Sequence, residues 1–228
     1  MSLIADVAAA LGAATGQPFD LTEQRQAGGG CINRSLVLGG KDGRRFFVKF
    51  NDVRHADMFA AEAEGLAQLD AAGAIRVPRP IAHGISGEWA YLALEWLDLG
   101  GRGSGVELGR CLAGLHRTTG ERFGWHRDNT IGSTHQPNAP GSDWIAFLAE
   151  RRLGYQLRLA ERNGATRKLA VDGERLISNL DAFFPGYRPV PSLLHGDLWG
   201  GNYGYAGGQP VLFDPAVYFG DREADLAM

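Results

Sequence analysis

The octapeptide HGDLWGGN, residues His195–Asn202, is the most informative segment of the chain. It sets the carboxylate of Asp197 five residues before the amide of Asn202, with Trp199 between them and glycines on both sides. Glycine, aspartate and asparagine are also the common residues of surface turns, for steric reasons. Taken alone, the segment fits either a turn or a catalytic loop, and the rest of the chain must distinguish the two.

The composition is that of a globular protein with little electrostatic character. The chain has 228 residues, of which 44% are hydrophobic and 21% charged, and its net charge is −3. Lys and Arg are dispersed, so no footprint for nucleic acid or an anionic membrane is expected. The two cysteines, Cys31 and Cys111, cannot make a disulfide framework or a four-cysteine zinc site. With no signal-peptide pattern and no apolar run of membrane-spanning length, we expect a cytoplasmic protein.

The first part of the chain predicts a sheet with one main helix. After an alanine-rich N-terminal helix, SLVLGG turns at KDG into RRFFVKF, the pattern of a β-hairpin with an Asp-Gly turn. Residues 52–72 then become helical in pattern, with Phe59, Leu66 and Leu69 on one stripe. The apolar run WAYLALEWL, residues 89–97, predicts a further strand.

The second part predicts mostly helices. Ser104 followed by Glu107 is a capping-box pattern ahead of a helix that Gly120 would end. A polar loop over residues 121–141 carries Trp125, His126, Asp128 and Asn129. Two further helices are expected, one from about Ser142 and one near residues 172–184. After the octapeptide, the stretch that ends in PVLFDP predicts a hairpin closed by AGGQ.

This order of elements predicts an α+β, two-lobed molecule. We expect residues 1–97 to form an N-terminal nucleotide-binding lobe with an antiparallel sheet. Residues 98–228 are expected to form a mostly helical catalytic lobe that carries the octapeptide in a hairpin.

An acidic residue downstream of the octapeptide favours its interpretation as a catalytic loop. His195, Asp197 and Asn202 fit H-x-D-x-x-x-x-N, and Asp214 follows twelve residues later on a hydrophobic strand. In a phosphotransferase, one carboxylate takes the proton of the attacking hydroxyl, while an amide and a second carboxylate hold Mg²⁺ on the ATP phosphates. Asp197 is therefore the predicted base, and Asn202 and Asp214 are the predicted Mg²⁺ ligands. Two carboxylates ~4 Å apart repel by roughly 4 kcal/mol at an effective dielectric of about 20, so we expect the ion to complete the site.

A lysine and a glutamate upstream fit the same chemistry. In FFVKF, strand alternation puts Phe46, Val48 and Phe50 on one face and Lys49 on the other. Glu62 falls on the apolar stripe of the following helix, where a carboxylate needs a partner. We therefore expect Glu62 to pair with Lys49 and to aim its ammonium at the α- and β-phosphates.

The segment GGGCINR, residues 28–34, predicts a turn that covers phosphate groups. Gly28, Gly29 and Gly30 would let backbone N–H groups approach phosphate oxygens, with Asn33 beside them. The segment lacks the last glycine of G-x-G-x-x-G, and no P-loop motif occurs, which disfavours a P-loop NTPase. Cys31 is either a small filler or, if exposed near positive charge, a redox-sensitive thiol.

Other contacts to the ligands are predicted from their position. Glu95, Trp96 and Leu97 close the WAYLALEWL strand and would form a hinge whose backbone meets adenine. Trp199 has an ordinary core interpretation, but beside the base it would stack on an acceptor, with His195 as a second acceptor contact. The remaining histidines lack ligand spacing and are expected at the surface or in packing.

These residues together resemble the fructosamine kinase (ketosamine-3-kinase) family, within the aminoglycoside-phosphotransferase-like kinases. The resembling stretches span nearly the whole chain and are GGGCINR, FFVKFN, MFAAEAEGL, RVPRPIAHG, GSTHQPNAPGSDW, HGDLWGGN and VLFDPAVYFGDREADLAM. The pair HGDLWGGN and FDPAVYFGDRE is typical of this family rather than of kinases at large.

The resemblance implies a protein-kinase-like fold and ATP- and Mg²⁺-dependent phosphorylation of the sugar 3-hydroxyl of ketosamines. These are fructosamine or ribulosamine adducts of amines or of protein lysines, and the activity is one of deglycation repair. Carried over by position, Asp197 matches the family's base, Asn202 and Asp214 its Mg²⁺ ligands, and Lys49 with Glu62 its phosphate-anchoring pair. Family members continue past FGDREADLAM into helices that wall the acceptor side, so the resemblance implies a C-terminally truncated chain.

Two alternatives stay open at this point. A kinase of the same fold could act on another small-molecule hydroxyl, such as that of an aminoglycoside or choline. A nucleotide-binding module without turnover would follow from a missing C-terminus, although retention of the acid–amide–acid set and the Lys49–Glu62 pair argues against it. The expected partners are ATP and a ketosamine, with no nucleic acid and no membrane, and the expected state is a monomer or weak dimer.

Overall fold

The computed structural model describes residues 3–28 and 33–228. The α-helices are α1 (Leu3–Thr15), α2 (Ala56–Ala72), α3 (Gly105–Leu115), α4 (Trp144–Phe147), α5 (Gly154–Arg162), α6 (Arg167–Ile177) and α7 (Glu223–Leu226). Other helical turns are the 3₁₀ segments η1 (Val53–His55) and η3 (Leu180–Phe183) and the π-helical η2 (Leu148–Leu153). The strands are β1 (Leu21–Gln26), β2 (Arg34–Gly40), β3 (Arg45–Asp52), β4 (Pro80–Ser86), β5 (Trp89–Glu95), β6 (Asn129–Ile131), β7 (Thr134–Gln136), β8 (Ser192–Leu194), β9 (Tyr203–Ala206), β10 (Gln209–Leu212) and β11 (Tyr218–Gly220).

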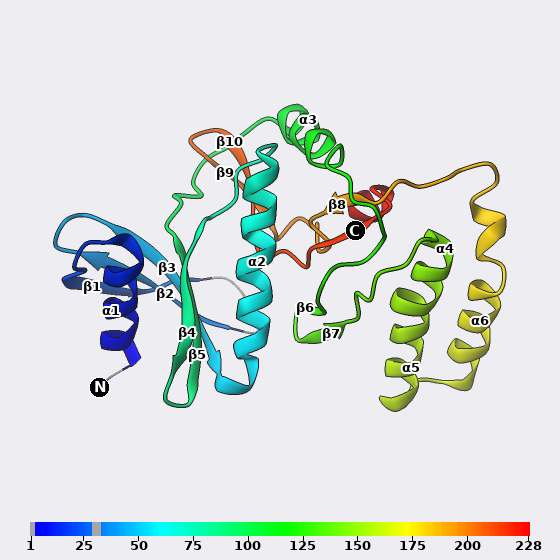
Figure 1. Ribbon diagram of the computed structural model, residues 1–228, viewed down its shortest axis with the longest axis horizontal. Coiled ribbons are helices and arrows are strands. Elements are labelled where there is room, and N and C mark those ends of the chain that lie inside the picture. The colour runs from blue at the N-terminus through cyan, green and yellow to red at the C-terminus, as the bar shows by residue number, and fades with distance from the viewer. Residues whose placement is uncertain (1–2, 29–32) are drawn as a thin grey trace.

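The N-terminal part is an antiparallel sheet in the order β1-β2-β3-β5-β4. The predicted β2–β3 hairpin is confirmed, and its turn uses Gly43 in the left-handed region at φ +83°. On one face, Phe46, Val48 and Phe50 of β3 pack with buried side chains of α1. The other face carries Lys49 and meets α2, so the two helices lie on opposite sides of the sheet (Figure 1).

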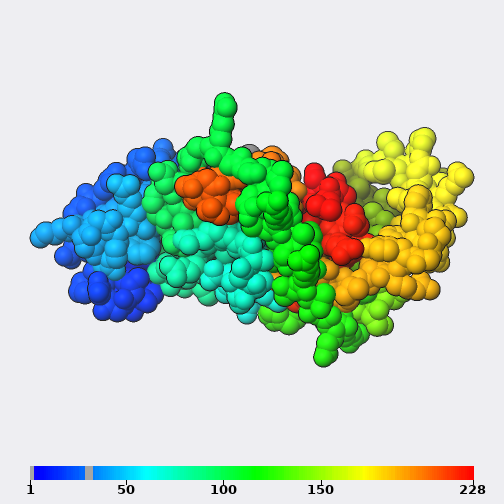
Figure 2. All heavy atoms as spheres, turned by 90° about the horizontal axis from the view of Figure 1, so that it is seen from above, coloured from blue at the N-terminus to red at the C-terminus, as the bar shows by residue number. Residues whose placement is uncertain are grey.

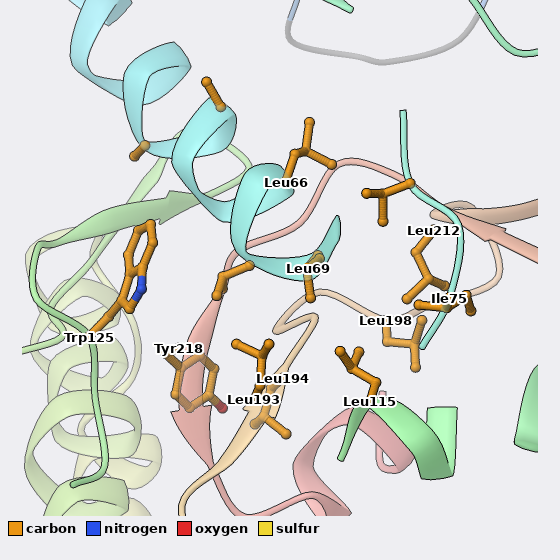
Figure 3. Close-up of a cluster of buried hydrophobic side chains, with 14 of the residues drawn as sticks. Leu66, Leu69, Ile75, Leu115, Trp125, Leu193, Leu194, Leu198, Leu212 and Tyr218 are labelled. Carbon is orange, nitrogen blue, oxygen red and sulfur yellow. The ribbon is translucent and has the colours of Figure 1, made fainter. Parts of the chain in front are cut away.

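Helix α2 joins the sheet to the rest of the molecule. Its predicted apolar stripe is confirmed, because Phe59, Leu66 and Leu69 are fully buried. The helix ends at Gly73, which adopts the left-handed conformation of a helix C-cap. Figure 3 shows Leu66 and Leu69 beside Leu193, Leu194, Leu198, Leu212 and Tyr218 of the C-terminal part. One hydrophobic cluster therefore crosses between the two lobes.

Helix α3 begins as predicted and ends earlier than predicted. The Ser104 hydroxyl accepts a hydrogen bond from the Glu107 backbone N–H, as in an N-cap. The helix stops at Leu115, not at Gly120. The reason is that residues 118–120 bond to the strand segment 191–193: Leu193 N–H donates to the Thr118 carbonyl at 2.8 Å, and Gly120 N–H donates to the Pro191 carbonyl at 2.8 Å.

The segment predicted as a polar loop, residues 121–141, contains the short β6–β7 hairpin. Within it, Trp125 and Asn129 are buried. Asn129 can be buried because its amide donates to the Val217 carbonyl at 2.8 Å, and its oxygen accepts from Gln136 at 2.9 Å and Asn138 at 2.8 Å. The loop interpretation missed these partners, two of which lie within the same segment and one of which, Val217, lies far along the chain.

The two later helices differ in detail from the prediction. The first starts after the Asp143 N-cap and runs through α4, η2 and α5, with a π-helical middle. The second, α6, begins at Arg167, five residues earlier than predicted, because Thr166 caps it by accepting from the Leu169 N–H. Helix α6 ends at Ile177, and the end of the predicted helix, up to residue 184, contains only the 3₁₀ turn η3.

The octapeptide lies between two small antiparallel pairs. Strand β8 precedes it and pairs with β11, while β9 and β10 follow it as the predicted hairpin. Figure 2 shows the sheet at one end of an elongated molecule and the α5–α6 pair at the other, with the C-terminal residues at the surface beside α3. None of the described helices combines the length and apolar character needed to cross a bilayer.

Candidate active site

The loop of residues 195–202 is bonded to the segment around Asp214 by backbone hydrogen bonds. The β9–β10 hairpin turns at Gly207 and Gly208, both in the left-handed region, and returns the chain to the loop. Phe213 N–H donates to the Asn202 carbonyl at 3.0 Å, and Ala216 N–H donates to the His195 carbonyl at 2.9 Å. Local turn chemistry thus brings together the two carboxylates that the sequence separates.

Asp197 and Asn202 contact each other directly. The Asn202 amide nitrogen donates to the Asp197 backbone carbonyl at 2.9 Å and to its carboxylate Oδ2 at 3.0 Å. The amide donor is therefore engaged, which leaves the Asn202 oxygen as its acceptor group for a cation. Burial raises the pKa of the Asp197 carboxyl, while His195 and the Asn202 hydrogen bond oppose the shift.

Lys49 is held between two carboxylates. Its Nζ lies 2.6 Å from Glu62 Oε1 and 2.6 Å from Asp214 Oδ1, so the predicted Lys49–Glu62 pair is present. Burial favours the neutral amine, but the two carboxylates outweigh it and raise the pKa of Lys49, which keeps the ammonium charged. Burial raises the pKa of Glu62, and the Lys49 charge opposes that shift.

Asp214 has an unusual backbone. Among the described residues it is the only one other than glycine with a positive φ, at +57°. Aspartate tolerates the left-handed region better than most residues, but the conformation still carries strain. Here the strained backbone directs the carboxylate to Lys49, and its side chain remains 44% exposed on the open side.

These residues line two hollows in the cleft between the lobes. The larger, of about 650 Å³, contains Lys49, Asn202 and Asp214 and also Gly28, Asn33, Glu95, Trp96 and Leu97. The smaller, of about 240 Å³, contains Asp197 with Thr130 and Gly132 of the β6–β7 hairpin. Trp199 is 54% exposed and lines both. A third, open hollow along α1, of about 800 Å³, contains none of these residues.

The remaining predicted nucleotide contacts have mixed outcomes. Gly28 and Asn33 line the larger hollow, whereas Gly29, Gly30 and Cys31 lie outside the described residues. The Glu95 carboxylate pairs with Arg76 at 2.5 Å and with Arg79 at 3.4 Å. Its side chain is thereby occupied and its N–H donates to the Arg79 carbonyl at 2.9 Å, so a hinge contact by Glu95 would use its carbonyl.

His195 does not reach the cleft. Its ring is fully buried and lines neither hollow, Nε2 lies 3.0 Å from the Phe213 carbonyl, and Nδ1 accepts from the Asp197 N–H at 3.3 Å. Burial lowers the pKa of this imidazole. The burial is inconsistent with the predicted acceptor contact, and the side chain instead supports the backbone that carries Asp197.

The sequence interpretation missed Asp225, which anchors the same loop. This carboxylate in α7 is 2% exposed. Its Oδ2 accepts from the His195 N–H at 2.9 Å and lies 2.9 Å from His116 Nε2, and its Oδ1 accepts from the Gly196 N–H at 2.8 Å. Charge-assisted bonds of this kind are strong and fix the loop. No signal in the short helical pattern EADLAM marked this residue.

Gly196 is required where it stands, because a side chain would have no room. Its φ is +80°, and an added Cβ would lie 2.1 Å from the Ala216 carbonyl oxygen. We expect Gly196→Ala to lower the free energy of unfolding by more than about 2 kcal/mol, beyond the conformational cost alone. Gly208→Ala is the matched control, since φ is +81° there and the space is open. Equal losses in urea unfolding would contradict the steric argument.

The fold and the site define a two-lobed, protein-kinase-like phosphotransferase. A sheet lobe carries a lysine paired to a helix glutamate, and a second lobe supplies the acid–amide–acid set. The chain belongs to the fructosamine kinase family, because the sequence model of that family matches residues 3–228.

Similar proteins agree with this assignment. A protein assigned as a ketoamine kinase from Synechocystis is 47% identical over 220 residues, covering 94% of this chain and 72% of that protein. The chloroplastic protein-ribulosamine 3-kinase of Arabidopsis thaliana is 43% identical over 218 residues, covering 93% and 67%. A crystal structure assigned as a fructosamine-3-kinase from Haemophilus somnus superposes with a TM-score of 0.88 at 28% identity, covering 97% of this chain and 75% of that one.

The same fold occurs in more distant solved structures. APH(2″)-IIa, solved as a ternary complex with streptomycin and ATP, superposes with a TM-score of 0.57 at 14% identity, covering 99% of this chain and 75% of that one. This likeness concerns the fold.

Proposed function

We propose that the protein is an ATP- and Mg²⁺-dependent kinase that phosphorylates the sugar 3-hydroxyl of ketosamines, free or on protein lysines. Residues 1–97 would bind the nucleotide and residues 98–228 would supply the catalytic groups. The observation that carries the proposal is the joining of Lys49, Glu62 and Asp214 by 2.6 Å contacts beside the Asp197–Asn202 pair. The relatives' names supply the acceptor class.

The donor set fits Mg²⁺. Asn202 and Asp214 offer oxygen atoms on one side of the larger hollow. Among residues 3–28 and 33–228, no three His, Cys, Asp or Glu side chains form a closed metal cage. Mg²⁺ itself uses one or two protein carboxylates together with phosphate oxygens and water, so it needs few ligands from the protein. When bound, the ion would neutralise charge on the phosphoryl group in transfer.

The chain's own groups account for binding and proton transfer. Lys49, kept charged and oriented by two carboxylates, would hold the phosphates of the nucleotide. Asp197 would accept the proton of the attacking hydroxyl, and the Asn202 amide holds its carboxylate in one orientation. Trp199 would give the acceptor sugar an aromatic platform at the mouth of both hollows.

Phosphate transfer to a panel of acceptors tests this function. Incubated with Mg-ATP, the protein should transfer phosphate to a fructosamine or a ribulosamine in preference to choline or an aminoglycoside. Chelation of the metal with EDTA should abolish the transfer, because two carboxylates and the phosphates would then face one another uncompensated. The readout is the phosphorylated product, identified by mass spectrometry. Transfer to no ketosamine, or transfer unaffected by EDTA, would refute the proposal.

A further inference from the structure

Helix α2 has a polar stripe besides the position of Glu62. Asp57, Glu64 and Gln68 are spaced by seven and four residues, so they lie on one side of a helix with 3.6 residues per turn. Glu62 is only two positions from Glu64 and therefore faces another direction. The helix thus presents Glu62 to Lys49 and a separate polar stripe to a different neighbour.

That neighbour is the segment of residues 124–129 in the C-terminal lobe, here called the strap. The Trp125 indole N–H donates to Gln68 Oε1 at 2.7 Å. The Arg127 guanidinium donates to Glu64 Oε2 at 2.9 Å and also to the Asp57 carboxylate. Figure 3 shows Trp125 against the side of α2. Bonds from two adjoining parts of the strap therefore hold the polar stripe along three helical turns.

The strap is bonded equally well to the chain that follows Asp214. Gly124 and Phe219 exchange two backbone hydrogen bonds, each of 2.8 Å. The Asn129 amide donates to the Val217 carbonyl at 2.8 Å. The strap therefore contacts α2 through its side chains and contacts residues 217–219 through its backbone and Asn129.

This arrangement links the two carboxylates on Lys49. Glu62 belongs to α2, and Asp214 stands three residues before Val217. The strap joins those two elements, while Lys49 itself bonds to Glu62 and Asp214. We propose that the strap sets the separation of Glu62 and Asp214, and that Arg127 is the positioning residue which thereby orients Lys49 for the nucleotide phosphates. The inference rests on the proposed function in one respect, since it takes Mg-ATP as the ligand.

Arg127 is the right residue to test. Exposed single ion pairs contribute little. The Asp57 and Glu64 carboxylates are 85% and 48% exposed, but the guanidinium is only 25% exposed and bridges both of them across two turns of α2. His126 Nε2 adds a longer contact of 3.4 Å to the same Glu64 oxygen. Arg127→Met removes both guanidinium contacts and keeps an unbranched apolar stem, whereas Arg127→Lys retains the charge and can reach one carboxylate at a time.

A double-mutant cycle on Mg-ATP affinity tests the proposal. Binding is measured calorimetrically with no acceptor present, so the result does not depend on which hydroxyl is phosphorylated. Arg127→Met should raise Kd for Mg-ATP about ten-fold in the wild-type background. In the Glu62→Gln background the same substitution should change Kd less than about two-fold, because the group it positions is already altered. Arg127→Lys should lie between wild type and Arg127→Met.

Controls separate positioning from general stability. Arg110→Met removes an exposed arginine paired to Glu107 within α3 and should leave Kd unchanged. Thermal unfolding of each variant should show the same shift from Arg127→Met in both backgrounds. Should Arg127→Met fold poorly, Glu64→Gln cuts the same contact from the helix side. Equal changes of Kd in both backgrounds, or none, would overturn the role of the strap; failure of the wild type to bind Mg-ATP would overturn the proposed function instead.

Discussion

Asp197→Asn should lower kcat for phosphate transfer by about 10²–10⁴-fold, the range that a general base contributes. The substitution removes the proton acceptor but preserves size, and an asparagine oxygen can still accept the 3.0 Å bond from the Asn202 amide. The loop should therefore stay folded, with Kd for Mg-ATP nearly unchanged. Steady-state kinetics with a ketosamine acceptor and calorimetry with Mg-ATP give the two readouts.

The comparison variant for this prediction is Asp181→Asn. Asp181 lies in η3 and is exposed, and it lines neither cleft hollow. Its replacement should leave kcat at the wild-type value. Undiminished transfer in Asp197→Asn would remove this carboxylate from the role of base.

Lys49→Met should affect both stability and nucleotide binding. The Lys49 side chain is 6% exposed. Removal of its ammonium leaves the Glu62 carboxylate buried beside Asp214 without a counter-charge. Breaking a buried pair in this way costs about 3–5 kcal/mol of unfolding free energy. Mg-ATP binding should fall below detection, because the phosphate contact is removed as well. Urea unfolding and calorimetry measure the two effects.

The pH dependence of this loss has a definite sign. Without Lys49, burial and Asp214 raise the pKa of Glu62 with nothing to oppose them. Below the unfolded pKa of about 4.3, Glu62 is protonated in both states, and the deficit is smallest. As pH rises from there through the raised folded-state pKa, the unfolded state ionises more readily and stability falls. The deficit should therefore be larger at about pH 8 than at about pH 5.

A second substitution separates the two effects of Lys49. In Lys49→Met/Glu62→Met both charges are gone, and apolar replacement of a buried pair is often neutral for stability. This variant should recover most of the unfolding free energy while binding Mg-ATP no better. Lys168→Met, which removes a lysine that is 83% exposed on α6, should change neither quantity. A double variant as unstable as Lys49→Met would contradict the buried-pair explanation.

The parts of the site that sequence predicted are those specified by local pattern. The hairpin between the octapeptide and Asp214 follows from turn residues and alternation over a short span. The side of β3 that bears Lys49 follows from strand alternation, and the side of α2 that bears Glu62 follows from helical period. Each of these needed only residues that are neighbours in sequence or on one element.

The parts that sequence did not predict depend on contacts between distant residues. His116 and Asp225 lie 109 positions apart, and neither has a spacing that indicates its partner. The sequence predicts a polar loop over residues 121–141 because it does not reveal the partners that let them be buried. One of these is the Val217 carbonyl, which only the tertiary structure brings to Asn129. His195 sits in the catalytic motif, yet only the tertiary structure places its ring behind the loop instead of in the cleft.

The position of Asp225 also bears on how the protein matures. The loop N–H groups of His195 and Gly196 find their carboxylate 30 and 29 residues later along the chain. When the octapeptide has just been synthesised, the residue that orders it has not yet been added to the chain. The sheet lobe can assemble from contiguous hairpins during synthesis, whereas the reactive loop acquires its final shape only after α7 has emerged. The reactive loop therefore reaches its final shape later than the sheet lobe does.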